Sequence, residues 1–436
     1  MDNIPINPKI RLSKVTIDGY RSCQNTQLPL NPEITALIGI NGAGKTNALN
    51  AIKLLGNRNH RVVHRSTEDV TLNETTITAW FDIAEKRIGY RSHMQLSISS
   101  RNADEIVSMH DEWNFQSITK SKAWKSIPRS LFFKKEMNRR LKNAKTPREH
   151  EMLLKQFERY EYDFFQNSKQ RSATLANDLF LEDDAVEAYV EEIEQFCRRI
   201  KYYSASQFTD PTRCPSSFEV ESDDRLVESY GSSRIHSKFL HDLYLLKKAN
   251  PDLYSVYEDL ISRNELGLIS KLSWKEVQLS SYVAEVKSGG EVKRVRKYKT
   301  LIIPKVQIGQ SHITFNQLSE GTFKTLALLF YIMTDDSSCI IIEEPEVCIH
   351  IGLLSRIIAT IKAYSKTKQV ILSTHSDQIL DQIESANVVI VEMTKAGTIT
   401  SEMNKWLGPK GRQALTSYLE ESGTLGEYWR SGGLAQ

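Results

Sequence analysis

The chain has 436 residues, 40% of them hydrophobic, and its 57 Lys and Arg against 54 Asp and Glu give a formal net charge of +3. This length allows two or three domains or one domain with large insertions, and the small net charge excludes binding to nucleic acid or membranes through overall charge alone. The five cysteines are scattered without a C-x-x-C pair, which excludes a disulfide scaffold and favours a reduced, cytoplasmic protein without structural zinc. No signal peptide is recognisable, and the longest apolar run, residues 326–333, is far shorter than the ~20 residues of a membrane span, so no membrane contact is expected.

The N-terminal part of the chain contains a phosphate-binding pattern in its expected context. Residues 10–17 alternate like a half-buried strand, residues 34–38 form an apolar run typical of a buried strand, and a helix is predicted from Asn47. Between the buried strand and the helix, residues 39–46 read Gly-Ile-Asn-Gly-Ala-Gly-Lys-Thr, which matches G-x-x-x-x-G-K-[ST]. The glycines let several backbone N–H groups converge on phosphate oxygens at a helix N-terminus. Lys45 is expected to reach the β- and γ-phosphates, and the Thr46 hydroxyl is expected to bind Mg²⁺.

The middle of the chain is predicted to insert helices into an otherwise α/β chain. Residues 75–83 and 94–98 are expected to form strands of a small antiparallel lobe, and residues 111–199 have a helical, highly charged pattern. The stretch 120–148 of this arm is strongly basic and contains aromatic residues, and the stretch that follows is acidic. Two interpretations stay open for the basic stretch: it contacts DNA or RNA, or it is a solvated helix that pairs with the acidic residues.

The next segments return to strand character. Residues 200–207 are predicted to form a strand that ends at Gln207, and residues 224–263 a second helical region. Residues 281–303 are expected to form a hairpin whose second arm is rich in Lys and Arg. These cations either contact phosphates or protect an edge strand from aggregation.

The last part of the chain carries polar residues at the ends of apolar strands. Residues 339–342 are followed by Glu343 and Glu344, which is the Walker B arrangement, and a later strand is followed by residues 373–376, Ser-Thr-His-Ser. Because ligands bind at the carboxyl ends of parallel strands, we expect these groups beside the phosphate loop, with Glu343 on the metal and Glu344 on the attacking water. The other elements predicted here are helices at 323–333 and 352–364, strands at 369–372 and 387–392, and a helical C-terminal tail.

The ordered motifs resemble the ATP-binding-cassette type of ATPase head of the RecF, SMC and OLD-like families. They are the phosphate loop, Leu-Ser-Glu-Gly-Thr at 318–322, Glu-Glu-Pro-Glu at 343–346 and Ser-Thr-His-Ser at 373–376, and the resemblance covers roughly 10–55 and 317–392. It implies an α/β fold, in which a mixed or parallel sheet with the phosphate loop is joined by an antiparallel β lobe and carries helical insertions. The expected division is 1–110 for the N-terminal part of the head, 111–199 for the helical arm, 200–223 for a return to the head with a candidate Q-loop, 224–280 for the second helical region, and 281–436 for the C-terminal part with signature, Walker B and switch histidine.

The resemblance also implies roles for single residues. The signature residues Ser319 and Gly321 would contact the γ-phosphate of a nucleotide bound by a facing head, and His375 would be the switch histidine. Gln207 is the candidate Q-loop residue, and Arg21 matches a nucleotide-contacting arginine, although surface hydrogen bonding remains the alternative for both. The expected nucleotide-binding residues are Arg21, Gly39, Asn41, Gly42, Ala43, Gly44, Lys45, Thr46, Asn47, Gln207, Ser319, Glu320 and Gly321; the catalytic ones are Glu344 and His375, and the Mg²⁺ ligands are Thr46, Glu343 and Gln207.

Two departures from the family pattern bear on these roles. The metal carboxylate of the families is usually Asp, whereas Glu343 is one methylene longer, and because Mg²⁺ requires near-octahedral geometry we expect slow turnover. The segment 347–351 also differs from the usual apolar-His-Leu-His-Pro, so neither Cys348 nor His350 is assigned a catalytic or metal-binding role.

The resemblance implies an ATP-driven switch that works as a homodimer or higher oligomer. As in the ATPase components of bacterial anti-phage systems, it would sense nucleic acid or a foreign protein and control a separately encoded effector such as a nuclease or toxin. The stretch after Glu392 contains no D-x-D motif, and HNH-type and Cys₂His₂ patterns are missing, so no nuclease domain is expected. The alternatives are a DNA-repair or DNA-clamping ATPase and a protein–protein scaffold with vestigial hydrolysis.

Overall fold

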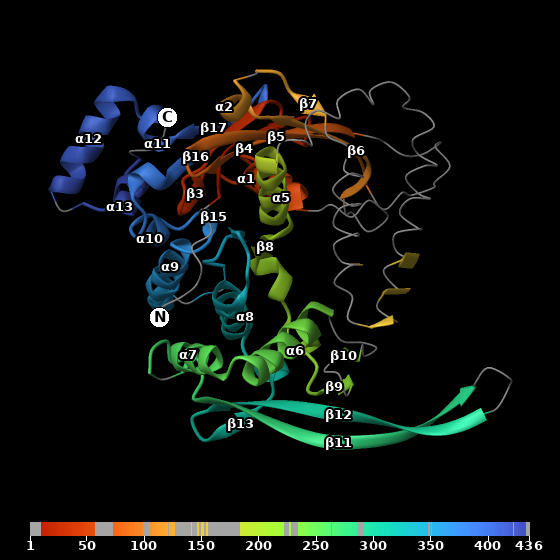
Figure 1. Cartoon of the computed structure of the whole chain (residues 1–436). Helices are drawn as coiled ribbons and strands as arrows, with labels where there is room; N and C mark the ends of the chain where they lie inside the picture. Colours follow the sequence, from red (N-terminus) through yellow and green to blue (C-terminus); the bar gives the residue numbers. More distant parts are fainter. Residues whose placement is uncertain are drawn as a thin grey trace. The chain divides into compact units, whose positions relative to one another are not determined.

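The computed structural model describes residues 10–56, 73–98, 104–120, 122–126, 141, 146–147, 150–151, 154–155, 184–221, 226–227, 234–262, 264–286, 292–347, 349, 351–421 and 423–432. The chain divides into two compact units (Figure 1). Unit 1 comprises residues 1–32, 39–201 and 389–402, and unit 2 comprises residues 33–38, 202–388 and 403–436. The chain therefore passes from unit 2 to unit 1 between Ile38 and Gly39, at the first residue of the phosphate-binding pattern.

Unit 1 contains a six-stranded antiparallel sheet of order β2-β1-β4-β5-β6-β7. Its strands are β1 Arg11–Asp18, β2 Thr26–Pro29, β4 Asn73–Ile83, β5 Lys86–Ile98, β6 Asp104–Asn114 and β7 Lys125–Ser126. In β4, Ile77, Ala79 and Phe81 are fully buried and alternate with more exposed residues, as expected for a sheet with one face on a core. The sheet confirms the predicted antiparallel lobe. The predicted boundary at residue 110 falls inside β6, because the prediction assigns the charged residues near the end of this strand to the helical arm.

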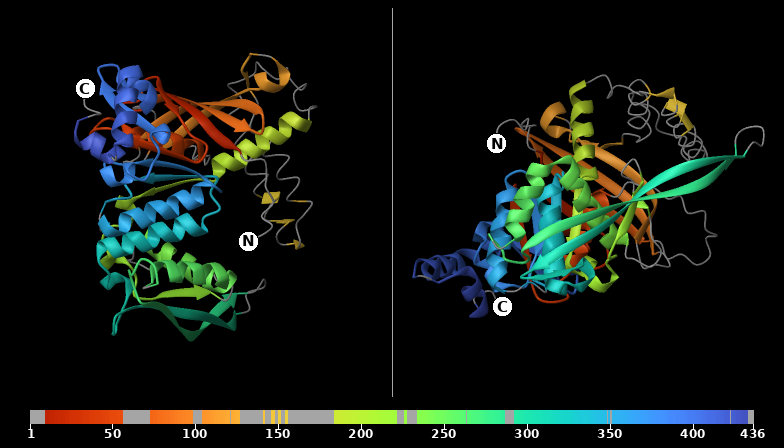
Figure 2. Two further views of the ribbon diagram at one scale, coloured as in Figure 1. Left: turned by 90° about the vertical axis from the view of Figure 1, so that its left-hand side faces the viewer. Right: turned by 90° about the horizontal axis from the view of Figure 1, so that it is seen from below.

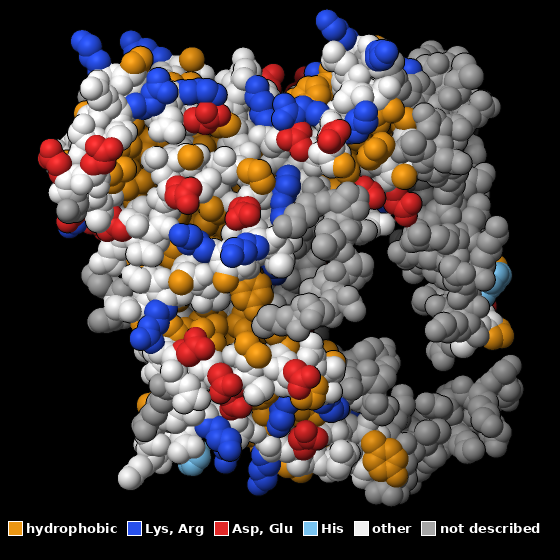
Figure 3. All heavy atoms as spheres, turned by 60° about the vertical axis from the view of Figure 1, so that its left-hand side comes forward, with side chains coloured by type: hydrophobic (Ala, Val, Ile, Leu, Met, Phe, Trp, Pro, Cys, Tyr) orange, Lys and Arg blue, Asp and Glu red, His pale blue; other side chains and the backbone are white. Residues whose placement is uncertain are grey.

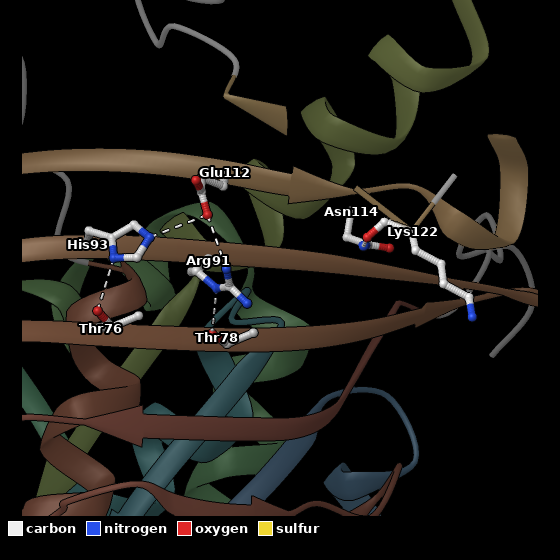
Figure 4. A network of polar contacts seen from close by, with 7 residues as sticks. All are labelled: Thr76, Thr78, Arg91, His93, Glu112, Asn114 and Lys122. Atoms are coloured by element: carbon white, nitrogen blue, oxygen red, sulfur yellow. Dashed lines mark hydrogen bonds and ion pairs between the residues drawn. The ribbon is translucent and has the colours of Figure 1, made fainter. Parts of the chain in front are cut away.

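A polar network crosses one face of this sheet and links three of its strands (Figure 4). Arg91 on β5 donates from Nε to Thr78 Oγ1 at 3.2 Å, and its Nη1 lies 3.2 Å from Glu112 Oε2. His93 Nε2 lies 3.4 Å from the same carboxylate oxygen. The Arg91 guanidinium also lies 3.9 Å from the ring centre of Trp124, so the segment before β7 is tied to the same network.

The remaining described elements of unit 1 are two helices, one short turn of helix and a hairpin. They are α1 Lys45–Gly56, α5 Asp184–Arg198, α2 Gln116–Thr119, β16 Val388–Thr394, whose first residue belongs to unit 2, and β17 Gly397–Glu402. The sequence predicted β16 but placed the helical tail directly after it, and β17 corrects this. In β17 the polar Thr398 is fully buried while Ile399 is 43% exposed, which reverses the usual pattern and hides the strand. Most of the predicted helical arm, including most of the basic stretch 120–148, lies outside the described residues.

Unit 2 contains parallel strands in the order β3-β15-β14. Their bounds are β3 Ile34–Ile38, β15 Gln369–Ser373 and β14 Cys339–Glu343. All residues of β3 and β15 and the first four of β14 are buried, as is typical of parallel strands covered on both faces. The register places Leu37 opposite Ser373 and Ser373 opposite Glu343, so the three carboxyl ends meet at one edge. This confirms the predicted α/β class.

Helices pack beside these strands in unit 2. The two longest near them, α8 Glu320–Thr334 and α9 Ile351–Ser365, lie side by side (Figure 2), and α9 also contacts β15. On α8, Phe323 and Phe330 pack against Phe239 of α6, with ring centres 5.7 and 5.5 Å apart. Helices α6 Arg234–Ala249 and α7 Pro251–Ile261 lie in the predicted second helical region, but the predicted range 224–280 also contains two strands, β10 Leu226–Val227 and the first part of β11 Lys271–Val286.

A long hairpin forms a second sheet in unit 2, of order β10-β9-β12-β11 with β13 beside β12. Strands β11 Lys271–Val286 and β12 Val292–Ile308 extend as a ribbon past β9 and β13 (Figure 1). The hairpin therefore begins earlier than the predicted residue 281, because the polar residues of the first part of β11 weaken the apolar alternation. The predicted turn around residues 288–290 lies outside the described residues.

The other described elements of unit 2 are short. They are β8 Ile200–Ser204, whose first two residues belong to unit 1, the 3₁₀ turns η2 Ala205–Phe208, η3 Pro211–Arg213, η4 Phe315–Gln317 and η5 Ser385–Asn387, the strands β9 Phe218–Glu221, β10 Leu226–Val227 and β13 Ser311–Ile313, and the helices α10 Asp377–Leu380, α11 Met403–Trp406, α12 Gly408–Glu420 and α13 Leu425–Arg430. The last three confirm the predicted helical tail. The strand predicted at 200–207 ends at Ser204, and Gln207 lies in η2 instead.

The described surface fits the nearly balanced charge of the sequence. On the face drawn in Figure 3, basic and acidic side chains are interspersed rather than separated into areas of one sign. None of the helices in the described part of the chain combines the length and the apolar character that crossing a bilayer requires.

Candidate functional site

The phosphate loop in unit 1 has the backbone geometry that its glycines predict. Gly42 and Gly44 have φ of +83° and +101°, where residues with a side chain are strained. A Cβ atom on Gly39 would lie 2.1 Å from the carbonyl oxygen of Val391, so this position also excludes a side chain. Strand β3 ends at Ile38 and α1 begins at Lys45, so the predicted order of strand, turn and helix is confirmed.

Lys45 is held inside the loop. The residue is 5% exposed, and its ammonium group donates to the carbonyl oxygens of Gly39 at 2.9 Å and Ile40 at 3.3 Å. Asn41, which precedes Lys45 in the loop, and Thr46, which directly follows it, are both exposed. The loop thus combines a buried cation, two glycines with positive φ and an exposed Thr at a helix start, which fits a bound phosphate chain.

Ser22 and Thr398, which the sequence analysis did not single out, form hydrogen bonds beside the phosphate loop. Thr398 Oγ1 on β17 lies 2.8 Å from Ser22 Oγ and 3.1 Å from the carbonyl oxygen of Ala43. The Asn47 side chain also donates to Ser22 Oγ at 2.8 Å. No motif marks Ser22 or Thr398, since they lie far apart in the sequence and only the fold brings them together.

Arg21 and Cys23 flank Ser22 on the same turn. Arg21 is exposed, has φ of 52°, and its guanidinium lies 5.1 Å from the centre of the Tyr20 ring. Cys23 is fully buried, and burial raises the pKa of its thiol, which keeps it protonated at neutral pH.

In unit 2 the carboxylates after β14 meet the residues after β15. Glu344 has φ of 47°, a strained value for a residue with a side chain, and its N–H donates to the carbonyl oxygen of Ser373 at 3.0 Å. Its Oε1 lies 3.5 Å from Nε2 of His375. The structure therefore brings the two predicted catalytic residues together, with Glu343 directly before them at the strand end.

Glu346 organises this group, although the sequence analysis assigned no role to it. Its Oε1 accepts hydrogen bonds from the Thr374 hydroxyl at 2.8 Å and from the backbone N–H of His375 at 2.7 Å. Its Oε2 is buried and has no partner in the part of the chain that the structure describes. The carboxylate of Glu346 therefore fixes the backbone that carries His375.

The signature segment lies at the start of α8, as predicted. Ser319 is the N-cap residue, and its Oγ accepts from the backbone N–H of Thr322 at 3.2 Å. Ser319 and Glu320 are exposed and Gly321 is half-exposed. Glu320 Oε1 lies 2.7 Å from Nζ of Lys324, a lysine that is only 5% exposed.

Tyr202 lies within β8, and Gln207 lies in the 3₁₀ turn that directly follows this strand. Gln207 is half-exposed in η2, next to Phe208, whose ring centre lies 6.3 Å from that of Phe323 on α8. Tyr202 donates its hydroxyl to Glu343 Oε2 at 2.5 Å, a contact that the sequence did not predict.

A small pocket in unit 2 has Glu343 in its lining. Its lining residues are Tyr203, Ser204, Phe208, Lys324, Leu328, Ile342, Glu343, Pro345, Val347 and Ile349.

The predicted residues thus fall into two groups. Arg21 and residues 39–47 belong to unit 1, whereas Gln207, residues 319–321, Glu343, Glu344 and His375 belong to unit 2. Cys348 and His350 lie outside the described residues. Within the described ranges, no cluster of three or more His, Cys, Asp or Glu side chains could hold a metal ion on its own.

The chain matches a protein family over most of its length and curated proteins over short segments. Residues 11–380 match the family described as an AAA ATPase domain. The DNA replication and repair protein RecF of Actinobacillus pleuropneumoniae serotype 5b is 36% identical over 69 residues, which are 14% of this chain and 19% of RecF. The Old nuclease of Escherichia phage P2 is 50% identical over 46 residues, which are 11% of this chain and 8% of that nuclease.

The chain therefore matches less than a fifth of the length of these curated relatives. Among solved structures, the SMC head domain from Thermotoga maritima aligns over 90% of this chain and 98% of that domain, with 10% identity and a TM-score of 0.41. The AAA ATPase match spans most of the chain and includes the phosphate loop, the signature, the Walker B carboxylates and His375. The chain belongs to the AAA ATPase domain family, and short segments of it are similar to RecF and to the Old nuclease.

Proposed function

We propose that the protein binds and hydrolyses ATP as a dimeric switch, in which ATP joins two heads and hydrolysis releases them. The observation that carries the proposal is the start of α8, where Ser319 and Glu320 are exposed at a capped helix N-terminus. An exposed helix start suits a phosphate of a nucleotide held by a second copy, because its free N–H groups and positive end attract anions. The cycle would control a separately encoded effector such as a nuclease or toxin.

The residues of each unit fit the parts of MgATP. In unit 1, Lys45 would bind the β- and γ-phosphates and Thr46 would ligate Mg²⁺. In unit 2, Glu343 would ligate Mg²⁺, Glu344 would orient the attacking water and accept its proton, and His375 would hold Glu344 in position through the contact at 3.5 Å. Bound Mg²⁺ would supply positive charge to the phosphate oxygens. For Gln207 and Arg21 we propose contacts to metal and nucleotide, respectively.

The experiment is a measurement of molar mass in solution with and without ATP. The Glu344→Gln variant keeps the size of the side chain but removes the base, so it should accumulate as an ATP-bound dimer, measured by light scattering after size exclusion. Ser319→Ala in the same background should return the protein to monomers while it still binds a fluorescent ATP analogue. Lys45→Ala, the control without nucleotide binding, should stay monomeric. Monomers of Glu344→Gln in saturating ATP would contradict the proposal.

A DNA-repair or DNA-clamping ATPase is the second candidate, and the match to RecF favours it. In that case DNA would stimulate ATP hydrolysis, and replacing the basic residues 134, 135, 139 and 140, which lie outside the described residues, would abolish the stimulation. Hydrolysis that ignores DNA, in a protein that co-purifies with an effector, supports the switch. Retained biological activity of Lys45→Ala would instead favour a scaffold with vestigial hydrolysis.

A further inference from the structure

Two adjacent tyrosines of β8 make different contacts with two carboxylates. Tyr202 donates its hydroxyl to Glu343 Oε2 at 2.5 Å, whereas Tyr203 donates to Asp335, the residue that caps the C-terminus of α8. Neighbouring residues of a strand point to opposite faces of the sheet. The Tyr202 hydroxyl therefore contacts the Walker B carboxylate, and the Tyr203 hydroxyl contacts the C-terminal end of α8. The two contacts have the same chemistry and differ in their acceptor.

The contact of Tyr202 matters because Glu343 stands where related ATPases usually have Asp. The additional methylene adds a rotatable bond, so an unrestrained Glu carboxylate reaches more positions than an Asp carboxylate does. A hydrogen bond to Oε2 restricts the rotation of the carboxylate, and a carboxylate has enough lone pairs on its two oxygens to accept this bond and also to ligate a metal ion. Groups that hydrogen-bond a metal ligand in this way orient it, and their loss typically weakens metal affinity by about 10–100-fold.

Tyr202 and Glu343 are both half-buried, and apolar side chains lie near the carboxylate. The pocket that includes Glu343 is lined partly by apolar side chains, among them Phe208, Ile342 and Pro345. A hydrogen bond is stronger where few waters compete for the acceptor. Lys324, which also lines this pocket, has its ammonium 2.7 Å from Glu320.

We propose that Tyr202 is the positioning residue for Glu343, and that its hydroxyl holds the longer carboxylate in the orientation that binds the Mg²⁺ of the nucleotide complex. This inference rests on the proposed function, because it assigns Glu343 to the metal. Tyr202 itself contacts neither metal nor nucleotide in this proposal. The hydroxyl thereby compensates for the additional methylene of Glu343.

The test measures Mg²⁺ binding rather than turnover. All variants carry Glu344→Gln to prevent hydrolysis, and a fluorescent ATP analogue is titrated first in EDTA and then with increasing Mg²⁺. Tyr202→Phe should leave the Kd in EDTA unchanged and should raise the Mg²⁺ concentration for half-maximal tightening at least about tenfold. Tyr203→Phe is the matched control and should leave that concentration unchanged. Thermal unfolding of each ligand-free variant controls for loss of folding.

A second comparison separates positioning from a general loss of packing. Glu343→Asp shortens the acceptor and withdraws it from the Tyr202 hydroxyl, so adding Tyr202→Phe to Glu343→Asp should have no further effect on Mg²⁺. An unchanged or lower Mg²⁺ requirement in Tyr202→Phe, or an equal rise in Tyr203→Phe, would overturn the inference alone. A wild-type chain that binds no nucleotide would overturn the proposed function, and this inference with it.

Discussion

Replacing Gly44 by Ala should destabilise unit 1 much more than the same change at Gly42. Both glycines have positive φ, so an added methyl costs about 1–2 kcal/mol of backbone strain at either position. At Gly44 the new Cβ would also lie 2.0 Å from Thr398 Oγ1, whereas at Gly42 no atom lies within 4 Å. Thr398 would have to move and would lose its contacts to Ser22 and Ala43, each worth about 0.5–1.5 kcal/mol. We expect a loss of about 3 kcal/mol for Gly44→Ala and about half of that for Gly42→Ala.

The assay is urea unfolding of the ligand-free protein, followed by tryptophan fluorescence. Trp113 in unit 1 is 1% exposed and reports the opening of that unit. A third variant, Thr398→Ser combined with Gly44→Ala, keeps the hydroxyl but removes a methyl group next to the clash, and it should recover part of the loss. Equal destabilisation of Gly42→Ala and Gly44→Ala would refute the reasoning, because backbone strain alone would then explain both.

Three further predictions concern unit 2. Burial lowers the pKa of His236, so below about pH 6.5 the unfolded chain takes up a proton that the native state does not. The free energy of unfolding should therefore fall between about pH 7 and pH 5, by at most about 1.4 kcal/mol per pH unit, and His236→Phe should reduce this slope in urea titrations. Gly426→Ala would place a Cβ 2.2 Å from the carbonyl oxygen of Asp377, so α13 should detach from α10 at a cost of about 1–3 kcal/mol, seen as hydrogen exchange in α13. Lys368→Met removes two donors from carbonyls at the end of α8 and should cost about 1.5–3 kcal/mol by thermal unfolding, whereas Met at the exposed Lys366 should cost little.

The parts of the fold that the sequence predicted are those with local signals. Strands β3, β14 and β15 are largely apolar runs, which are typical of parallel strands buried on both faces, and polar residues follow the apolar part of β14 and of β15. The phosphate loop has a spacing pattern that includes its own turn and helix start. Glu344 and His375 could be paired in advance, because each follows a strand that ends at the same edge.

The parts that could not be predicted depend on long-range contacts or on reversed patterns. Strand β6 carries acidic residues toward both of its ends, and β17 buries Thr398 while it exposes Ile399. The contacts of Thr398 with Ser22 and of Tyr202 with Glu343 join residues that are remote in the chain. No spacing rule links such pairs, so their roles become visible only once the strands are placed.

The signature helix shows how one hydroxyl can serve both stability and the proposed contact with a second copy. Ser319 Oγ accepts the N–H of Thr322 and so caps α8, and it donates its own proton to Thr322 Oγ1 at 2.8 Å. A phosphate oxygen that replaced Thr322 Oγ1 as acceptor would leave the cap bond intact. Only one exposed hydroxyl–hydroxyl bond is then exchanged for a charge-assisted one, which is roughly twice as strong. In the proposed dimer the helix start would therefore bind the phosphate in its present conformation, and joining two heads would not need to reorder it.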